Sequence, residues 1–119
     1  MRTKDQKLAE EAYSRVIIRK NQPRFNFAEY VSFAMSFPTL IHTCGLVQAV
    51  AFAEAKDMGA YIEDLQAVFG AIDVDDDIHA MARSAELAEY ARISRHALSA
   101  SSWIKRYCQA MRGDNDYAV

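Results

Sequence analysis

Residues 37–56 read FPTLIHTCGLVQAVAFAEAK, and the spacing of their apolar residues predicts one helix from Pro38 to about Lys56. Proline suits the first turn of a helix, where its missing N–H is not needed. A single apolar arc of this helix would hold Ile41, Cys44, Val47, Ala51 and Phe52. Gln48 would lie within the arc and Gly45 beside it, although glycine is a poor helix former. We therefore expect Gln48 to be a buried amide with a hydrogen-bond partner, and Gly45 to let a neighbouring helix approach closely.

The N-terminal part of the chain predicts two further helices from its capping residues. Thr3 with Gln6 forms a capping box for a helix that runs to about Lys20, and Asn26 with Glu29 opens a second helix. The residues expected to face the core are Leu8, Ala12, Tyr13, Val16 and Ile17 in the first helix and Phe27, Tyr30, Val31 and Ala34 in the second. No segment of the sequence has the alternating pattern of a strand.

The second half of the chain predicts three more helices. One follows Gly59, a short one lies near residues 78–82, and a long one runs over residues 84–111. The acidic turn at 73–77 can cap the short helix, and Gly113 would close the long one. The apolar residues of the helix after Gly59 are Ile62, Leu65, Val68 and Phe69.

Together these patterns predict an all-α fold, a compact single-domain bundle of five or six helices with a long C-terminal helix. The domain would span residues 1–113, and residues 114–119 would form a frayed tail. Cys44 and Cys108 fit no zinc or CxxC spacing, so we expect both to be reduced in the core of a cytoplasmic protein. Residues 30–53 carry no formal charge, but their polar groups are too many for lipid, and we expect no membrane partner.

Charge is unevenly distributed along the chain, which has a net charge of −2. Residues 1–24 hold seven basic residues against three acidic ones, residues 25–82 hold one against nine, and residues 83–119 hold six against four. Phosphate neutralisation dominates nucleic-acid affinity, so a chain with this net charge would bind nucleic acid weakly by itself. A local basic stripe could still supplement a larger partner.

The long C-terminal helix carries such a stripe, about 21 Å in length. Its members recur at alternating spacings of three and four residues, and they are Arg92, Arg95, Ser99, Ser102 and Arg106. Arginines alternating with small hydroxyls suit a phosphate backbone, because serine lets the backbone approach and donates a hydrogen bond. An ordinary solvated helix face is the alternative. Lys4, Arg15 and Arg19 form a weaker pattern of this kind on the first helix, where Glu11 can pair with Arg15.

The other side of the predicted 38–56 helix is weakly polar with exposed apolar residues, which suits a protein partner. This face holds Thr39, His42, Thr43, Leu46, Val50 and Ala53.

Motifs for catalysis or metal binding do not stand out. An EF-hand loop begun at Asp73 would need glycine and glutamate where Ile78 and Ser84 stand. The three histidines form no HExxH motif, and no Gly-rich phosphate loop or Ser-His-Asp order is found. We therefore expect no catalytic residue, no metal and no cofactor.

The chain resembles the small subunit of the Cmr-type (type III-B) CRISPR RNA-targeting complex in three motifs. They are MRT-x-x-Q at the start, P-x-L-I-x-x-x-G-L-x-Q-A-x-A-F-x-x-x-K over residues 38–56, and Y-x-R-x-x-R-x-A-L followed by W-I-K-R over residues 90–106. The central motif is not a generic amphipathic pattern. His96 stands where an acidic residue is expected, Tyr107-Cys108 replaces a more familiar Phe-Ala, and residues 57–82 resemble nothing specific.

The resemblance implies an all-helical, non-catalytic protein that stacks head to tail along the inside of a filament of larger backbone subunits. There it would help hold the guide RNA–target RNA duplex, while the backbone subunits cleave RNA. The implied partners are the backbone and large Cmr subunits, copies of the chain itself, and the duplex. We predict that the RNA-binding residues are Arg15, Arg19, Arg92, Arg95, Lys105 and Arg106, and that neighbouring subunits contact Thr39, His42, Leu46 and Val50.

Two alternatives remain. The small subunit of the related Csm-type (type III-A) complex has a similar role. A helical DNA-binding regulator could use the stripe as a recognition helix, but it would need a short turn before an exposed helix, which the predicted C-terminal helix lacks.

Overall fold

The computed structural model of the protein describes residues 2–75 and 77–116, with side chains up to Met111. Over these residues the chain forms six helices and no strand, which confirms the predicted all-α class. The helices are α1 (Lys4–Lys20), α2 (Phe27–Cys44), α3 (Leu46–Ala55), α4 (Gly59–Gly70), α5 (Ile78–Ser84) and α6 (Leu87–Asp116).

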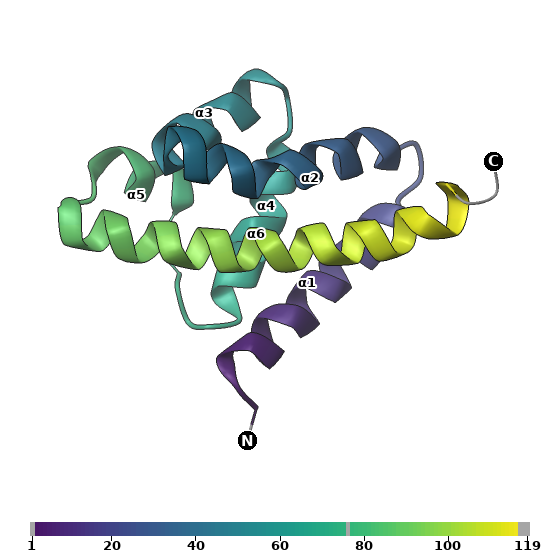
Figure 1. The fold of residues 1–119 in the computed structure, drawn as a ribbon, viewed down its shortest axis with the longest axis horizontal. Helices are drawn as coiled ribbons and strands as arrows, with labels where there is room; N and C mark the ends of the chain where they lie inside the picture. The colour runs from purple at the N-terminus through teal and green to yellow at the C-terminus, as the bar shows by residue number, and fades with distance from the viewer. Residues whose placement is uncertain (1, 76, 117–119) are drawn as a thin grey trace.

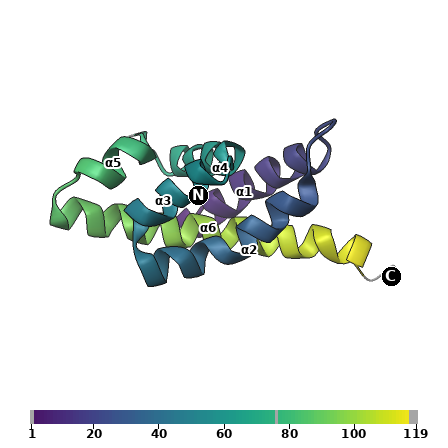
Figure 2. The same ribbon diagram turned by 90° about the horizontal axis from the view of Figure 1, so that it is seen from above.

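Helix α6 is the element around which the others pack. It runs along the length of the molecule, and its contacts with α2 and α1 are the most extensive between any two helices (Figure 1). Helix α4 lies behind α6 and contacts α1 as well, while α3 and α5 pack together near one end (Figure 2). The inner side of α6 is formed by the buried residues Ile93, Ala97, Ala100, Ile104 and Cys108.

The predicted helix caps are confirmed. In α1 the Thr3 hydroxyl accepts a hydrogen bond from the Gln6 N–H at 3.1 Å, and the Gln6 side chain accepts one from the Thr3 N–H at 2.8 Å. The Asn26 side chain caps α2 through the Glu29 N–H at 3.0 Å, and Asp77 caps α5. Each cap satisfies a backbone donor that the helix itself leaves without a partner.

The core face of α1 is as predicted, with one exception. Leu8, Ala12 and Val16 are fully buried and Ile17 packs partly against the core. Tyr13 was expected there, and this prediction is wrong, because its side chain is 49% exposed and packs edge-on against Tyr107 of α6. An aromatic ring beside a neighbouring helix can bury one edge while its other face stays in solvent.

The chain breaks at Gly45 and not before Pro38, so the predicted single helix over 38–56 is wrong. Helix α2 continues through Pro38 to Cys44, and α3 begins at Leu46. Gly45 has a φ of +87°, a conformation that glycine adopts readily and other residues rarely. The packing of α2 along α6 outweighs the cost of a proline inside a helix.

The start of α3 is capped by a residue distant in the sequence, Tyr90 of α6. Gly45 has no side chain that could cap α3, and the Tyr90 hydroxyl instead accepts a hydrogen bond from the Val47 N–H at 3.1 Å. A Cβ added at position 45 would lie 3.3 Å from the same hydroxyl. Gly45 therefore does allow a close approach, as expected, and the approaching helix is α6.

The break changes the rotational phase of α3 relative to α2. The residues of α3 that face the core therefore differ from those predicted for one continuous helix. Gln48 is exposed, so the expectation of a buried amide is wrong. Val47 and Phe52, expected inside, are 39% and 41% exposed, whereas Leu46 and Val50 are buried. Once a glycine resets the phase, the 100° periodicity cannot be carried from one helix into the next.

The C-terminal helices differ from prediction at their ends. Ser84 belongs to α5, and α6 begins at Leu87 and continues through Gly113 to Asp116, so Gly113 does not close it. The predicted frayed tail at 114–119 therefore begins within a helix, and residues 117–119 lie outside the described residues. Among the described helices, none is both long enough and apolar enough to cross a membrane.

The two cysteines have different environments. Cys44 is exposed at the end of α2, so its predicted place in the core is wrong, whereas Cys108 is fully buried. Burial, with a smaller contribution from the negative charge of Asp64, raises the pKa of Cys108 to about 12. The Cys108 thiol therefore stays protonated and behaves as a small apolar side chain.

A buried carboxylate links three helices. Asp64 of α4 is fully buried, and its Oδ1 accepts hydrogen bonds from Arg15 Nε at 2.7 Å and Arg19 Nη2 at 3.0 Å. Its Oδ2 accepts from Arg19 Nε at 2.9 Å and from the hydroxyl of Tyr30 on α2. Burial and the adjacent carboxylate raise the pKa of Tyr30, so its hydroxyl remains a donor. All four donors form hydrogen bonds to the Asp64 carboxylate. Without them, burying this negative charge would cost a large amount of folding free energy.

Replacing that carboxylate should destabilise the fold strongly. Asp64→Ala leaves the buried Arg19 guanidinium with only the exposed carboxylate of Glu63 at 3.4 Å, and we expect it to lower the free energy of unfolding by about 3–5 kcal/mol. Urea denaturation followed by circular dichroism measures the change. The matched control is Glu63→Ala at the adjacent residue, whose side chain is 72% exposed and which should cost about 0–1 kcal/mol. Equal losses in the two variants would contradict the assignment.

Gly45→Ala should lower the free energy of unfolding by about 1–3 kcal/mol, because alanine is strained at this positive φ. Gly70→Ala is the control, since its added Cβ meets no atom within 4 Å and it lies in a helix; it should be neutral or slightly stabilising. Repeating Gly45→Ala in a Tyr90→Phe background separates backbone strain from contact with the hydroxyl. A loss no greater than that of Gly70→Ala would show that position 45 tolerates a side chain.

Candidate nucleic-acid interface

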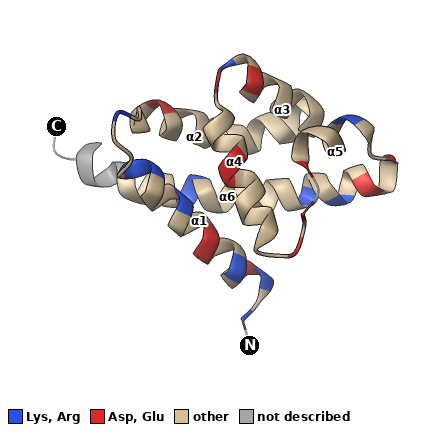
Figure 3. Cartoon of the chain, turned by 180° about the vertical axis from the view of Figure 1, so that it is seen from behind, with Lys and Arg blue, Asp and Glu red and all other residues tan. Residues whose placement is uncertain are grey.

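The predicted stripe lies on the outer side of α6, between α1 and α2. Arg95, Ser99 and Arg106 are exposed, and Arg92 and Ser102 are half-buried. Seen from behind, Lys and Arg recur along α1 and α6, which also carry some Asp and Glu, whereas α4 and the loop before α5 show Asp and Glu alone (Figure 3). The uneven charge of the sequence is thus also unevenly distributed among the helices.

The cations on this side of α6 differ in whether an ion pair within the protein already neutralises their charge. Over the described side chains, Arg95, Lys105 and Arg106 form no ion pair, and Arg106 lies 6.0 Å from the ring centroid of Trp103. Arg92 is paired with Glu89 one turn earlier on α6. Arg95, Lys105 and Arg106 therefore have charges available for a phosphate, whereas the charge of Arg92 is partly neutralised.

Arg15 and Arg19 do not join this surface. Both point inward to Asp64, and Arg19 is only 7% exposed. The prediction that they lie on an exposed RNA-facing surface with the stripe is wrong, because a buried carboxylate on α4 is a closer and less hydrated partner than solvent phosphate. The expected pairing of Arg15 with Glu11 is replaced by contacts with Asp64 and, at 3.8 Å, Glu63.

Two lysines at the start of α1 lie beside the stripe and extend its basic surface. The sequence did not predict that they would lie next to α6. Lys4 and Lys7 line a groove with Arg92 and His96 of α6 and with Asp73 after α4, and Lys4 Nζ lies 3.1 Å from His96 Nδ1. The sequence hinted at Lys4 through its pattern with Arg15 and Arg19, and at Lys7 only through the basic excess of the first 24 residues, since contact across 92 positions leaves no local pattern.

His96 lies among like charges. Its ring contacts Lys4 through Nδ1 and Arg92 through Nε2 at 3.3 Å. Burial, and then the charges of Lys4, Arg92 and Arg95, lower the pKa of His96, against a smaller opposing effect of Glu89. The neutral imidazole thus has one ring nitrogen that can accept a hydrogen bond, either from Lys4 of α1 or from Arg92 of its own helix.

Two further grooves flank the stripe. One, which we call the Trp103 groove, has a volume of about 350 Å³ and is lined by Asp5, Leu98, Ser99, Ser102, Trp103 and Arg106. The other lies on the α2 side and is lined by Pro38, Ser102, Lys105, Arg106 and Gln109. Ser102 and Arg106 belong to both, so the stripe forms a ridge with a shallow groove on each side.

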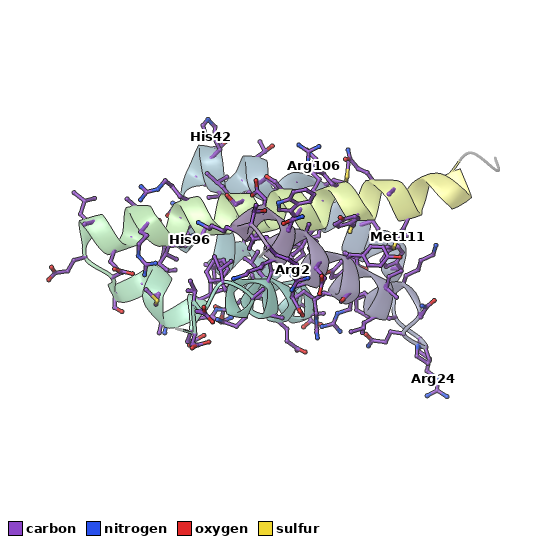
Figure 4. The ribbon with its side chains drawn as sticks, turned by 90° about the horizontal axis from the view of Figure 1, so that it is seen from below. Arg2, Arg24, His42, His96, Arg106 and Met111 are labelled. Atoms are coloured by element: carbon purple, nitrogen blue, oxygen red, sulfur yellow. The ribbon has the colours of Figure 1, made fainter. Side chains whose placement is uncertain are left out.

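The predicted subunit-contact face is only partly a surface. Thr39 and His42 are exposed on α2, and His42 projects on the same side of the molecule as Arg106 (Figure 4). Leu46 and Val50 are buried, so the prediction that they contact a neighbouring subunit directly is wrong. The break at Gly45 turns them inward, and a polar substitution at Leu46 would disturb the core of the isolated chain as well.

The short turn that the DNA-binding alternative needs is present, contrary to the sequence-based expectation. Ala85 and Glu86 alone separate α5 from α6. Helix α6 is nevertheless packed along its length, with α1 and α2 on either side. A recognition helix must protrude to enter a major groove, so this arrangement does not favour that alternative. Over the described residues, no group of three or more His, Cys, Asp or Glu side chains could hold a metal ion.

The chain is similar to proteins of one family along nearly its whole length. The family model described as CRISPR-associated protein (Cas_Cmr5) matches residues 4–111. The CRISPR system Cmr subunit Cmr5 of Thermus thermophilus is 37% identical over 114 residues, which cover 93% of this chain and 97% of that protein. The X-ray crystal structure of a CRISPR-associated Cmr5 family protein, also from Thermus thermophilus, has a TM-score of 0.78 and 36% identity, covering 92% of this chain and 97% of that one.

The environment of His96 predicts a measurable pH dependence. Because its pKa is lowered from the usual 6.5, the folded protein binds this proton less tightly than the unfolded chain does. His96 should therefore reduce stability as the pH falls below about 6.5, and contribute nothing at higher pH. Lys4→Gln removes the nearest like charge and should raise the pKa of His96, measured by NMR titration of the ring.

Arg24→Gln is the control for that titration, because Arg24 lies far from His96 (Figure 4). An equal shift in both variants would contradict the proximity effect of Lys4.

Proposed function

The chain belongs to the Cmr5 family of CRISPR-associated proteins, and from this we propose that it is a non-catalytic small subunit of a Cmr (type III-B) complex whose α6 surface helps hold a guide RNA–target RNA duplex. The observation that carries the proposal is the row of Arg95, Lys105 and Arg106, three cations on one helix without an ion-pair partner over the described side chains. The exposed Ser99 and half-buried Ser102 lie between them and can donate hydrogen bonds to phosphate.

The low charge of the chain is compatible with this role. A single copy would make only a few phosphate contacts, and its net charge of −2 would not hold RNA by itself. Copies stacked head to tail along a filament of backbone subunits would act together, because binding by one copy raises the effective concentration of RNA at the next.

Within the proposed complex the basic residues have different roles. Arg95, Lys105 and Arg106 contact phosphate, with Lys4 and Lys7 extending the surface at one end. Arg92 contributes less, since Glu89 neutralises part of its charge. Arg15 and Arg19 stabilise the fold through Asp64.

A neighbouring subunit would contact the exposed part of α2 and the start of α3. Thr39 and His42 are exposed there, and Val47, at 39% exposure, adds an apolar contact. This surface replaces the one predicted from the sequence, since Leu46 and Val50 support it from inside the core.

Removing two of the unpaired cations should weaken RNA retention in the assembled complex. We expect Arg95→Ala with Arg106→Ala to lower duplex affinity and to reduce the slope of log affinity against log salt by about 2, one for each lost phosphate contact. The measurement is filter binding of labelled duplex to complexes reconstituted with each variant.

The control is a double variant of two other exposed arginines, Arg24→Ala with Arg83→Ala, which lie in the α1–α2 loop and on α5. Unchanged retention and an unchanged salt slope in the Arg95/Arg106 variant, with normal assembly, would refute the proposed RNA contact.

A further inference from the structure

A row of aromatic side chains lies at the surface where α1 meets α6. Tyr13 packs edge-on against Tyr107 at 5.3 Å between ring centroids, and Tyr107 stacks on Trp103 at 6.0 Å with an interplanar angle of 24°. The Arg106 guanidinium ends the row, 6.0 Å from the Trp103 centroid, near the outer limit of a cation–π contact. Tyr13 is exposed, and Trp103 and Tyr107 pack against the core with part of each side chain exposed.

The Trp103 groove at the end of this row is lined by three kinds of functional group. Trp103 provides an aromatic wall, Ser99 and Ser102 provide hydroxyls, and Asp5 provides a carboxylate. Asp5 is exposed and forms no ion pair with any described residue, although Arg106 lines the same groove. The Asp5 carboxylate lies in the first turn of α1, where it complements the helix N-terminus, and its two oxygens can accept hydrogen bonds from a ligand in the groove.

We propose that the Trp103 groove binds an unpaired guanine base of RNA, a proposal that rests on the proposed function and adds a base-specific contact to it. Guanine presents two adjacent donors, N1–H and the 2-amino group, which match the two oxygens of the Asp5 carboxylate. Adenine and cytosine each present one donor beside an acceptor, so one carboxylate oxygen would face a lone pair. A base-paired guanine hides this edge, so the groove selects a nucleotide outside the paired region.

The remaining groups of the groove fit the rest of a nucleotide. The base lies against the Trp103 ring, where stacking supplies affinity for any base. Arg106 is exposed and loosely held at 6.0 Å, so its guanidinium is free to move to the phosphate, with Lys105 beside it. The groove is continuous with the basic ridge through Ser102 and Arg106, which favours RNA over a protein segment as its occupant.

Trp103 is the one tryptophan of the sequence, so it reports directly on this groove. The full chain is titrated at low salt with short single-stranded RNAs that differ at one central base, and tryptophan fluorescence is excited where tyrosine does not absorb. We expect saturable quenching by a guanine oligonucleotide and about tenfold weaker binding when inosine, which lacks the 2-amino group, replaces guanine. Adenine and cytosine oligonucleotides should bind more weakly still.

Asp5→Asn tests the base edge without removing the stacking surface. It replaces one acceptor by a donor, so the preference should move from guanine towards adenine and cytosine, whose exocyclic amine lies beside an acceptor. Arg106→Ala is the matched comparison, and it should weaken binding of all four oligonucleotides alike. Circular dichroism establishes that both variants fold, and reconstituted complexes containing Asp5→Asn should retain duplex RNA as the unaltered protein does.

Each outcome decides the matter. Guanine-selective quenching that Asp5→Asn changes supports the proposal. Quenching with no base preference, or a preference that survives Asp5→Asn, overturns the guanine assignment. Quenching caused by the other Cmr subunits without RNA would make the groove a protein contact and overturn it as well. If no oligonucleotide quenches Trp103 while the complex still holds duplex through Arg95 and Arg106, the groove proposal fails and the proposed function stands.

Discussion

The buried carboxylate of Asp64 is the interaction on which the arrangement of the helices depends. It fixes α1 to α4 through Arg15 and Arg19, and it fixes α2 to the same point through the Tyr30 hydroxyl. Apolar contacts would let these helices slide or rotate at modest cost, whereas a charge in the interior tolerates little displacement of its donors. Because α1 is held in this way, its first turn is directed onto α6, where Lys4 and Lys7 meet the stripe.

The same interaction divides the basic residues of the protein into two populations. The arginines in the middle and end of α1 neutralise an internal charge, whereas Arg95, Lys105 and Arg106 of α6 form no ion pair among the described side chains. Net charge therefore describes this molecule poorly. The acidic excess of residues 25–82 partly serves to hold α1 from inside through Asp64, and basic residues of α6 and of the start of α1 lie together in one groove.

Local signals in the sequence predicted local structure well. The capping residues Thr3 and Asp77 begin helices as expected, because a cap needs only neighbours within one turn. Helix ends such as Gly113 apart, the main failures involve distant partners. In the sequence alone, Pro38 is a stronger signal for a helix break than Gly45, but in the fold the packing of α2 against α6 supports a helix that continues through Pro38. Arg19 and Arg95 look alike in the sequence, although Arg19 has a buried partner 45 positions away. Lys4 became part of the site only through contact with His96.

Helix α6 is at once an inner wall of the core and the carrier of the outer stripe, and this double use limits how its sequence can change over evolutionary time. Inserting or deleting one residue within it would rotate every later side chain by about 100°. Such a change would bring Ile104 out of the core and Arg106 off the ridge together, so neither defect could be compensated separately. Loops such as the one around Pro23 can vary in length, but the spacing along α6 must be inherited unchanged, which makes this helix the natural reference for aligning distant relatives.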